Sequence, residues 1–375
     1  MSVTFAKPPP SYVYLDEESC KLYEDATEKG AYSLTTAERS WRDRYEALLS
    51  KGYRLRPRYH PDWSPSWVGT NRDPTFSEDA VLLRHWHIID AVRIVDKQLV
   101  TIKIVENNFQ EIEIAQALTT PALLDDPTNR CVRVLDVFPD THEENAFLTV
   151  MPYLHPFNSP PFGAVGEVVD FVKQTLEGLS FIHSQGVAHR DCAAANIMMD
   201  GSPLYPEGHH PMRRDFSVDA VWPLNPLPRL DNPVKYYFID FGISSRFRQG
   251  EPALVTGLKG RDKELPELSA RVPYDPSKAD IFILGNLYKK EILEKYHGVD
   301  FLWPLVSAMT KREPKSRPDA RFALTFFTVL LDNNVVRNMR WRIRPRDESI
   351  PERVVYDTVA MARETFYQLK RIVSS

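Results

Sequence analysis

The sequence predicts an α+β protein with two lobes, a small antiparallel β-sheet lobe followed by a larger, mainly helical lobe. Hydrophobic residues make up 43% and charged residues 26% of the 375 residues, which is typical of a chain that can bury a full-sized core. Short β-rich runs bounded by polar turns gather between residues 80 and 150. After residue 160, apolar residues recur with the period of a helix.

Residues 1–79 are expected to form an extension that packs on the following domain. One helix is predicted in it, because Thr35 and Glu38 have the spacing of a capping box, apolar residues follow at helical spacing, and Gly52 ends the pattern. The segment 52–70 is rich in Pro, Arg and Trp, and its prolines exclude a regular helix or ladder. We expect an irregular strap with packed aromatic side chains; a proline-rich ligand or a nucleic-acid contact is the alternative.

The main domain is predicted to span residues 80–332, with the sheet lobe at 80–150 and the helical lobe at 155–332. One short helix, at 111–118, is expected between the strands. The predicted strands are the runs VLLRHWHII, DAVRIV, LVTIKIV, CVRVLDVF and AFLTVMPYL.

The helical lobe is predicted to begin with a long helix, since apolar residues from Val165 to Ile182 follow a 3.6-residue period and Gly186 ends it. The stretch 201–234 contains seven prolines and indicates a loop insertion, after which KYYFI predicts a strand. Residues 333–375 are expected to form a C-terminal helical extension, because apolar residues again fall on one helical face.

Charge and cysteine content exclude several classes of protein. Lys and Arg total 47 against 51 Asp and Glu, for a net charge of −4, so the clustered positive charge needed for nucleic-acid binding is not expected. Three widely spaced cysteines with no CxxC pair predict no disulfide framework or zinc site and favour a reducing compartment. No apolar run is long enough to cross a bilayer. We expect an intracellular protein, cytoplasmic or nuclear, with no nucleic-acid partner and no membrane span.

Two motifs carry the chemistry. His189-Arg190-Asp191 is followed by Asn196 in the pattern H-R-D-x-x-x-x-N, and Asp240-Phe241-Gly242 follows the predicted strand KYYFI. In this order they resemble the catalytic loop and the metal-binding loop of the eukaryotic protein-kinase family. The resemblance covers about residues 80–332 and implies a two-lobed protein kinase-like fold. It extends to a narrower set of fungal kinase-like proteins through HRDCAAANIMMD, YYFIDFG and RPRYHPDWSPSW.

The resemblance also includes three scaffold positions. Leu265-Pro266-Glu267 is similar to the A-P-E motif, and Arg317 lies in a segment similar to the one whose arginine pairs with the A-P-E glutamate. Asp280 lies on a helix similar to the one whose aspartate braces the catalytic loop. Small-molecule kinases of related architecture generally lack these features, so that class is disfavoured.

The resemblance implies a role for each polar residue of the two loops. Asp191 would accept the proton of the substrate hydroxyl, and Asn196 and Asp240 would hold Mg²⁺, which prefers oxygen ligands. Arg190 would neutralise a phosphate or an acidic group on the activation segment, which runs from Asp240 to Glu267. Thr256 lies within that segment and is either a candidate phosphorylation site or an ordinary loop residue.

The resemblance also implies an ATP site. Lys103 ends the sequence VTIK, where the family has V-A-I-K, and would neutralise the α- and β-phosphates. An ion pair with Glu111 would position it, whereas Glu113 is expected to face solvent. The gatekeeper position and the hinge, whose backbone groups would contact adenine, correspond to Met151, Pro152, Tyr153 and Leu154.

Three departures from the family pattern weaken the enzymatic interpretation. No glycine lies between Gly69 and Lys103, so the glycine-rich phosphate loop is absent. Ala193 and Ala195 stand where serine/threonine kinases usually carry a lysine and tyrosine kinases an arginine. The insertion 201–234 separates the two loops by far more than the family needs; we expect it to be a solvated decoration, with substrate docking as the alternative.

These residues predict a protein kinase-like phosphotransferase that uses ATP and Mg²⁺ to phosphorylate a protein hydroxyl, Ser or Thr rather than Tyr. The alternative is a pseudokinase, a nucleotide-binding or scaffold module that transfers no phosphate, which the missing glycine loop favours. A small-molecule kinase is a third, disfavoured hypothesis. Neither a particular protein substrate nor an oligomeric state follows from the sequence.

Overall fold

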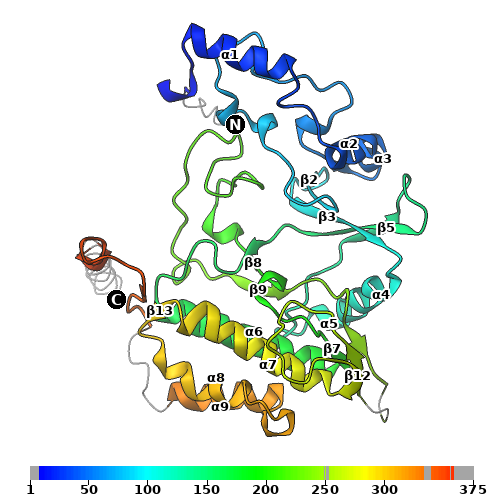
Figure 1. The fold of residues 1–375 in the computed structure, drawn as a ribbon, viewed down its shortest axis with the longest axis vertical. Helices are drawn as coiled ribbons and strands as arrows, with labels where there is room; N and C mark the ends of the chain where they lie inside the picture. Colours follow the sequence, from blue (N-terminus) through cyan, green and yellow to red (C-terminus); the bar gives the residue numbers. More distant parts are fainter. Residues whose placement is uncertain (1–7, 249, 251–252, 333–338, 355, 359–375) are drawn as a thin grey trace. The chain divides into compact units, whose positions relative to one another are not determined.

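The computed structural model describes residues 8–248, 250, 253–332, 339–354 and 356–358 (Figure 1). The chain divides into two compact units. The small unit takes its described residues from Met1–Phe109, Val134–Tyr153 and Tyr205–Leu227. The large unit takes its described residues from Gln110–Arg133, Leu154–Leu204 and Pro228–Ser375. The first contains an antiparallel sheet and the second is mainly helical, which confirms the predicted α+β class with a small sheet lobe and a larger helical lobe.

The predicted domain bounds at residues 79 and 332 remain predictions. Residues 8–79 belong to the same compact unit as the sheet. Most of the predicted C-terminal helical extension lies outside the described residues, although within it Arg344–Pro345 (β14) pairs with Tyr296–His297 (β13).

The main sheet of the small unit has the order β1-β2-β3-β5-β4, and every neighbouring pair is antiparallel (Figure 1). Its strands are β1 (Tyr53–Arg54), β2 (Ile88–Arg93), β3 (Leu99–Glu106), β4 (Asp136–Pro139) and β5 (Ala146–Pro152). The predictions at LVTIKIV and AFLTVMPYL are confirmed.

Three of the predicted strands are wrong in extent. VLLRHWHII and DAVRIV join into the single strand β2, which begins only at Ile88 because an isolated bridge between His85 and Ile88 turns the chain just before it. CVRVLDVF is a strand only from Asp136, since Cys131 instead forms a parallel bridge with Phe238 in the large unit. The run CVRVLDVF therefore contributes residues to both the large unit and the small unit.

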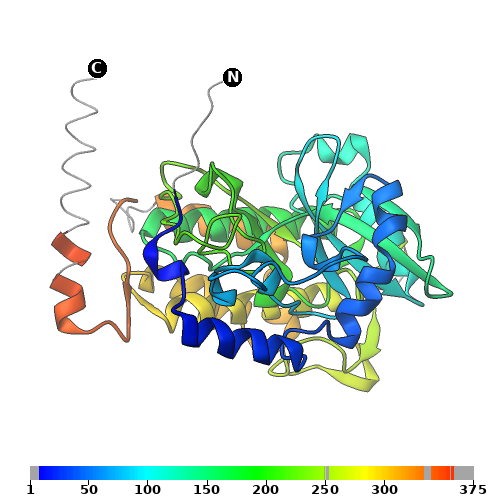
Figure 2. The ribbon, with the colours of Figure 1, turned by 90° about the horizontal axis from the view of Figure 1, so that it is seen from above.

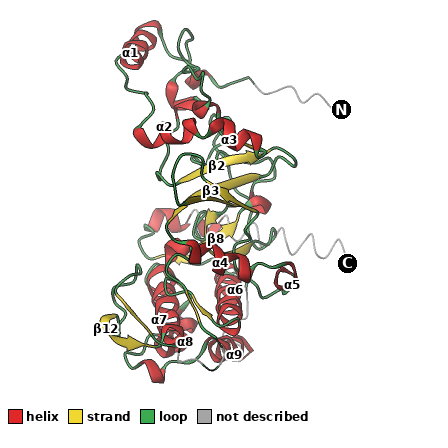
Figure 3. Ribbon diagram, turned by 90° about the vertical axis from the view of Figure 1, so that its right-hand side faces the viewer, coloured by secondary structure: helices red, strands yellow, loops and turns green. Residues whose placement is uncertain are grey.

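In the part of the chain that the structure describes, three α-helices precede the sheet, namely α1 (Glu17–Glu28), α2 (Thr36–Asp43) and α3 (Tyr45–Ser50). The predicted capping box is confirmed: the Glu38 N–H donates to Thr35 Oγ1 over 3.2 Å, and the Thr35 N–H donates to Glu38 Oε2 over 2.9 Å. The predicted single helix breaks at Arg44, whose buried guanidinium is bonded to Asp140 over 3.0 Å from Nε. In Figure 3, α2 and α3 lie beside the sheet, where they bury Trp41 and Leu48 against its apolar face.

Helix α1 was not predicted from the sequence pattern, and none of its residues is fully buried. Asp16 caps it by accepting the Ser19 N–H over 2.8 Å. The helix lies against the strap (Figure 2), because Trp67 Nε1 donates to Thr27 Oγ1 over 3.0 Å. Trp67 is itself buried, so the strap packs its aromatic side chains as expected, although Tyr53 and Arg54 do form the short strand β1.

Two arginines of the strap are buried with acidic partners. Arg58 Nε lies 2.8 Å from Glu38 Oε1, and both side chains are 0% exposed. Arg56 Nε lies 3.0 Å from Asp90 Oδ2, and its Nη1 donates to the Val81 carbonyl over 3.0 Å. Because an unpaired buried charge is strongly destabilising, these pairs fix the path of the strap across the small unit.

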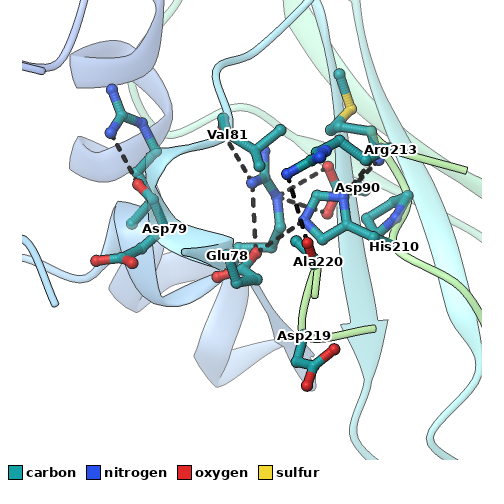
Figure 4. Close-up of polar contacts among 12 residues, drawn as sticks. Glu78, Asp79, Val81, Asp90, His210, Arg213, Asp219 and Ala220 are labelled. Atoms are coloured by element: carbon teal, nitrogen blue, oxygen red, sulfur yellow. Dashed lines mark hydrogen bonds and ion pairs between the residues drawn. The ribbon is translucent and has the colours of Figure 1, made fainter. Parts of the chain in front are cut away.

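The insertion is not a solvated decoration, which corrects that expectation. Its residues Tyr205–Leu227 belong to the small unit, and His210 is fully buried there, with Nε2 lying 3.3 Å from Glu78 Oε1 (Figure 4). Arg213 donates to the carbonyls of Thr75 and Ala220. The partners Glu78 and Thr75 lie in the N-terminal segment, so polar contacts bind the insertion and that segment to each other.

The large unit is built around helices, which Figure 3 shows in red. They are α4 (Phe109–Leu118, whose first residue is grouped with the small unit), α5 (Pro121–Leu124), α6 (Val165–Ser184), α7 (Pro276–Tyr288), α8 (Trp303–Met309) and α9 (Ala320–Leu330). The predicted helices at 111–118 and 165–182 are confirmed. Helix α6 packs on α9 and α7 packs on α8. No helix among the described residues combines the length and apolar character needed to cross a bilayer.

Short strands join the loops of the large unit into small sheets. These strands are β6 (His155–Pro156), β8 (Ile197–Asp200) and β9 (Lys235–Phe238) in one sheet, β7 (Val187–Ala188) with β10 (Ser245–Arg246), and β11 (Val255–Gly257) with β12 (Ser269–Tyr274). The strand predicted at KYYFI is confirmed as β9.

The buried pair of Glu38 and Arg58 yields a test of the small unit. We expect Glu38→Gln to lower the free energy of unfolding by about 3–5 kcal/mol at neutral pH, because Arg58 is left buried without its counter-charge. Burial alone would raise the pKa of Glu38, but the hydrogen bonds from Arg58 and from the Thr35 backbone hold that pKa below its usual value of 4.5. Urea unfolding of both proteins measures the difference.

A carboxylate with a lowered pKa stabilises the fold above its ordinary pKa and loses that contribution as the pH falls. The gap between wild type and Glu38→Gln should therefore narrow below pH 4.5. Glu46→Gln, the same change at an exposed position on α3, is the matched control and should leave stability within about 0.5 kcal/mol. A similar loss in both variants would contradict the interpretation.

Candidate active site

A buried carboxylate holds the H-R-D loop in place. Asp280 on α7 is 0% exposed and accepts the backbone N–H of His189 over 2.8 Å and that of Arg190 over 2.6 Å. Its Oδ2 also lies 2.9 Å from His183 Nε2. The bracing implied for Asp280 is thus present in the geometry, and His183, which the sequence pattern leaves without a partner, is part of it.

The ring of His189 joins the two loops. Burial lowers the pKa of His189, so the imidazole is neutral, and its two nitrogens take different roles. Nε2 donates to the Ile239 carbonyl over 3.0 Å, and Nδ1 accepts the Asp191 N–H over 3.3 Å. The ring also lies 5.1 Å from that of Phe241, centroid to centroid. One buried side chain thereby fixes the loop of Asp191 against the segment that leads into Asp240.

Asp191 and Asn196 are brought together. Asn196 is 2% exposed, and its Nδ2 donates to Asp191 Oδ2 over 2.8 Å and to the Asp191 carbonyl over 3.0 Å. Because Nδ2 makes both bonds, the amide oxygen of Asn196 is turned away from Asp191. That oxygen is the atom a cation would require.

Asn196 and Asp240 lie at the same end of a strand pair. Strands β8 and β9 are antiparallel with Ile197 opposite Phe238, so the residue before β8 faces the residue after β9 (Figure 1). The Ile239 N–H donates to the Asn196 carbonyl over 3.0 Å, which places Asp240 one residue beyond that contact. An amide oxygen and a carboxylate on adjacent loops match the oxygen ligands that Mg²⁺ prefers. The residues present therefore fit the implied ion.

Arg190 connects the catalytic loop to the activation segment. Its φ is 68°, in the left-handed region, and Nη1 donates to Ser245 Oγ over 3.1 Å. Nη2 donates to the carbonyl of Thr256 over 3.1 Å. Its Nε is buried and has no acceptor among the described residues. A buried donor beside the exposed Thr256 is compatible with an acidic group on this segment.

The far end of the activation segment is fixed by a bidentate ion pair. Arg317 Nη1 lies 2.5 Å from Glu267 Oε1, and Nη2 lies 2.8 Å from Oε2. The Arg317 side chain is 0% exposed, and it also donates to the Lys278 carbonyl over 2.9 Å. The pairing implied by the A-P-E resemblance is therefore present.

The small unit carries the other predicted site residues. Lys103 lies on β3 opposite Thr149, and Met151 lies on β5 opposite Thr101, so Lys103 and Met151 share one face of the sheet. The alternate positions, such as Ile102 and Val150, are buried in the core on the other face. Lys103 and the gatekeeper position are thus presented on the same side of two neighbouring strands.

The predicted hinge residues differ in whether they have a backbone N–H group and in what that group contacts. Pro152 has no N–H, and the Tyr153 N–H donates to the Leu99 carbonyl over 3.2 Å. The Tyr153 hydroxyl donates to the Pro211 carbonyl of the insertion over 2.5 Å and accepts from Arg214 Nε over 3.1 Å. The insertion therefore fixes the side chain of a predicted hinge residue, which the sequence pattern does not indicate.

Glu111 and Leu154 lie in the large unit, whereas Lys103 lies in the small unit. On α4, Glu113 is exposed, and the buried residues are Ile112, Ile114, Ala115 and Leu118. The ion pair of Lys103 with Glu111 stays a prediction.

The Arg317–Glu267 pair yields a test of the large unit. We expect Arg317→Met to reduce the free energy of unfolding by about 3–5 kcal/mol, because Glu267 loses its partner and three backbone carbonyls lose a donor. Arg321→Met, at an exposed position on α9, is the matched control and should change stability by less than about 0.5 kcal/mol. Equal effects in chemical unfolding would show that the buried pair contributes nothing specific.

No known family profile matches the chain. The solved structure of the Rad53 kinase domain with SCD2 aligns with 63% of this chain and 84% of that chain, with a TM-score of 0.39 and 16% identity. Over 131 residues, or 34% of this chain, the sequence is 45% identical to a light-sensor protein kinase of Ceratodon purpureus. Over 181 residues, or 46%, it is 28% identical to mitogen-activated protein kinase kinase kinase A of Dictyostelium discoideum.

Over 162 residues, or 42% of this chain, it is 24% identical to the serine/threonine-protein kinase ppk8 of Schizosaccharomyces pombe. The matched parts make up 9%, 18% and 26% of these three relatives, so the chain spans about a quarter of their length or less. Parts of this chain are thus similar in sequence to protein kinases.

Proposed function

We propose that this chain is a protein kinase-like phosphotransferase that moves the γ-phosphate of ATP to a protein hydroxyl, Ser or Thr rather than Tyr. The hydroxyl oxygen forms a bond to the γ-phosphorus while the bond to the ADP oxygen breaks, and Asp191 takes the hydroxyl proton. Asn196 and Asp240 hold Mg²⁺, which neutralises phosphate charge. Lys103, positioned by Glu111, binds the α- and β-phosphates.

The observation that carries this proposal is the arrangement of Asp191, Asn196 and Asp240 at one end of the β8–β9 pair. Asn196 donates to Asp191 over 2.8–3.0 Å and accepts the N–H of Ile239, the residue before Asp240, over 3.0 Å. Asp191 is 8% exposed, and a carboxylate at such a position lowers stability unless it has partners or binds a cation, so its presence favours a functional role. The similarity to protein kinases supports the same reaction class.

Further parts of the proposal concern adenine and the compartment. Met151 and the backbone of Pro152, Tyr153 and Leu154 receive the base, with the insertion holding the Tyr153 hydroxyl. The cysteines Cys131 and Cys192 are buried thiols, which suits a reducing compartment, cytoplasmic or nuclear. The similarity to a fission-yeast kinase supports relatives among fungal kinase-like proteins.

One observation favours the alternative, a pseudokinase. Between β1 and β2, where the family has its glycine-rich loop, the chain runs through residues 55–87 with Gly69 as the one glycine. This segment is fixed by the buried ion pairs of Arg56 and Arg58 and does not form a short glycine hairpin. Without the glycines that allow backbone N–H groups to approach phosphates closely, nucleotide affinity should be low.

Nucleotide binding is tested by thermal unfolding with and without millimolar ATP and Mg²⁺. Binding to the folded state must raise the Tm, by an amount equivalent to about 2.7 kcal/mol at about a hundredfold excess over Kd. We expect Asp240→Asn to lose the Mg²⁺-dependent part of the shift. Asp25→Asn, an exposed change on α1, should keep it. No shift in the wild type would contradict ATP binding, and a shift independent of Mg²⁺ and of Asp240 would favour the pseudokinase.

Phosphate transfer is tested with radiolabelled ATP and mixed protein acceptors such as casein and myelin basic protein. Asp191→Asn should reduce incorporation by about 10²–10⁴-fold, because the general base is lost. Its Tm response to ATP and Mg²⁺ should remain, which separates loss of catalysis from loss of binding. Incorporation equal to that of the wild type would rule out Asp191 as the base.

A further inference from the structure

The part of the catalytic loop that follows Asp191 carries no positively charged side chain. Residues 191–196 read Asp-Cys-Ala-Ala-Ala-Asn, with no lysine or arginine. In phosphoryl transfer a carboxylate base and a phosphoryl group of the same sign must approach each other, and preorganised cations near them stabilise the transition state. Ala193 and Ala195 supply no such cation next to the base, so one has to come from another part of the chain.

Arg261 of the activation segment lies beside the carboxylate of Asp191. Its backbone N–H donates to Asp191 Oδ1 over 2.7 Å, and its Nε lies 3.7 Å from Asp191 Oδ2. Together with the Asn196 Nδ2 bond to Oδ2, both oxygens of Asp191 have a fixed partner. The guanidinium is thus held at ion-pair distance from the proposed base.

The backbone just before Arg261 allows the activation segment to approach Asp191 closely. Gly260 has φ of 114°, a conformation that side chains rarely adopt, and a Cβ there would lie 3.3 Å from the Arg190 carbonyl and 3.7 Å from Asp191 Oδ1. On the other side of Arg261, Asp262 accepts from Asn286 of α7 over 2.7 Å. Glu264 Oε1 lies 2.7 Å from Lys290 Nζ. Arg261 is therefore held between a glycine turn and two attachments to the helical core.

The side chain of Arg261 is also open to a substrate. It is 59% exposed, whereas the Asp191 side chain is 11% exposed. An exposed guanidinium next to a nearly buried carboxylate can contact an anionic group that arrives from solvent without leaving its ion pair. Guanidinium groups bind phosphate oxygens with two parallel donors.

We propose that Arg261 is a positioning residue for Asp191 that supplies, from the activation segment, the cation that the residues after Asp191 lack. This inference rests on the proposed phosphotransferase function. The backbone N–H orients the carboxylate toward the hydroxyl, and the guanidinium compensates the negative charge that gathers between Asp191 and the transferring phosphoryl group.

The same contact could instead obstruct the base, since Arg261 occupies Asp191 where a hydroxyl would approach. If Arg261 supports Asp191, removing the guanidinium should lower the rate of phosphate transfer. If Arg261 obstructs Asp191, the same change should raise that rate. Arg261→Gln keeps the backbone N–H and removes the charge, so it isolates the side chain. Arg271→Gln, on the neighbouring strand β12 and exposed, is the matched control.

The experiment measures kcat and KM for ATP with the radiolabel assay and casein as acceptor, for wild type, Asp191→Asn, Arg261→Gln, Arg261→Lys and Arg271→Gln. A double variant, Arg261→Gln with Ala193→Lys, returns a cation to the loop two residues after Asp191. We expect Arg261→Gln to lower kcat by about 10- to 100-fold, less than the loss of a fully buried transition-state donor because the guanidinium is partly screened by water. KM for ATP and the Tm should be unchanged.

Arg261→Lys should retain an intermediate rate, Arg271→Gln the full rate, and Ala193→Lys should recover most of the lost kcat. A purely structural role for Arg261 would not be rescued by a lysine elsewhere, so failure of the rescue overturns the proposal. An unchanged or raised rate in Arg261→Gln also overturns it, and a raised rate identifies an obstructing contact. If the wild type transfers no more phosphate than Asp191→Asn, the proposed function fails and this inference fails with it.

Discussion

The carboxylate of Asp280 is the constraint on which the rest of the candidate active site depends. It is fully buried, and its charge is compensated by two backbone N–H groups and by His183. A buried carboxylate without such partners would be strongly unfavourable, so the helix α7 and the H-R-D loop must fold as one piece. The left-handed backbone at Arg190, with φ of 68°, is compatible with this because the two N–H bonds offset a conformation that costs on the order of 1–3 kcal/mol.

Beyond Asp280, a series of hydrogen bonds fixes the neighbouring segments, and each bond satisfies a buried polar group. The neutral ring of His189 links the loop to Ile239, and the Ile239 N–H in turn bonds Asn196. The activation segment is then fixed at successive positions, by the β7–β10 pair near its start, by Arg190 at Thr256 and by Arg317 at Glu267. The polar residues are thus held by a chain of local contacts within the large unit, and the fixed segment is what brings Arg261 to Asp191.

The features that could be predicted from sequence are those whose partners lie close in the chain or in a fixed motif. The capping box of Thr35 and Glu38, the helix at 165–182 and the strand before Asp240 depend on neighbours within a few residues, and the structure contains all of them. The motif likewise predicts that Asp191 and Asn196 share one loop, where the structure brings them into contact.

What sequence patterns missed depends on distant partners. The helix breaks at Arg44 because the arginine pairs with Asp140, and the insertion folds into the small unit because His210 meets Glu78. Helix α1 buries no residue completely, so it leaves no apolar stripe to detect. Arg261 reaches Asp191 only through a turn made possible by Gly260, which no spacing rule reveals.

The path of the chain has a consequence for how the protein is made. The small unit is assembled from three separate stretches, the last of which ends at Leu227. During synthesis, the ribosome must extend the chain past residue 210 before Glu78 can meet His210. Until then the buried acidic and basic groups of the strap lack some of their partners, and an incomplete nascent chain exposes them. Truncation after the sheet would therefore not yield a stable fragment, and the two units cannot be separated by a single cut between them.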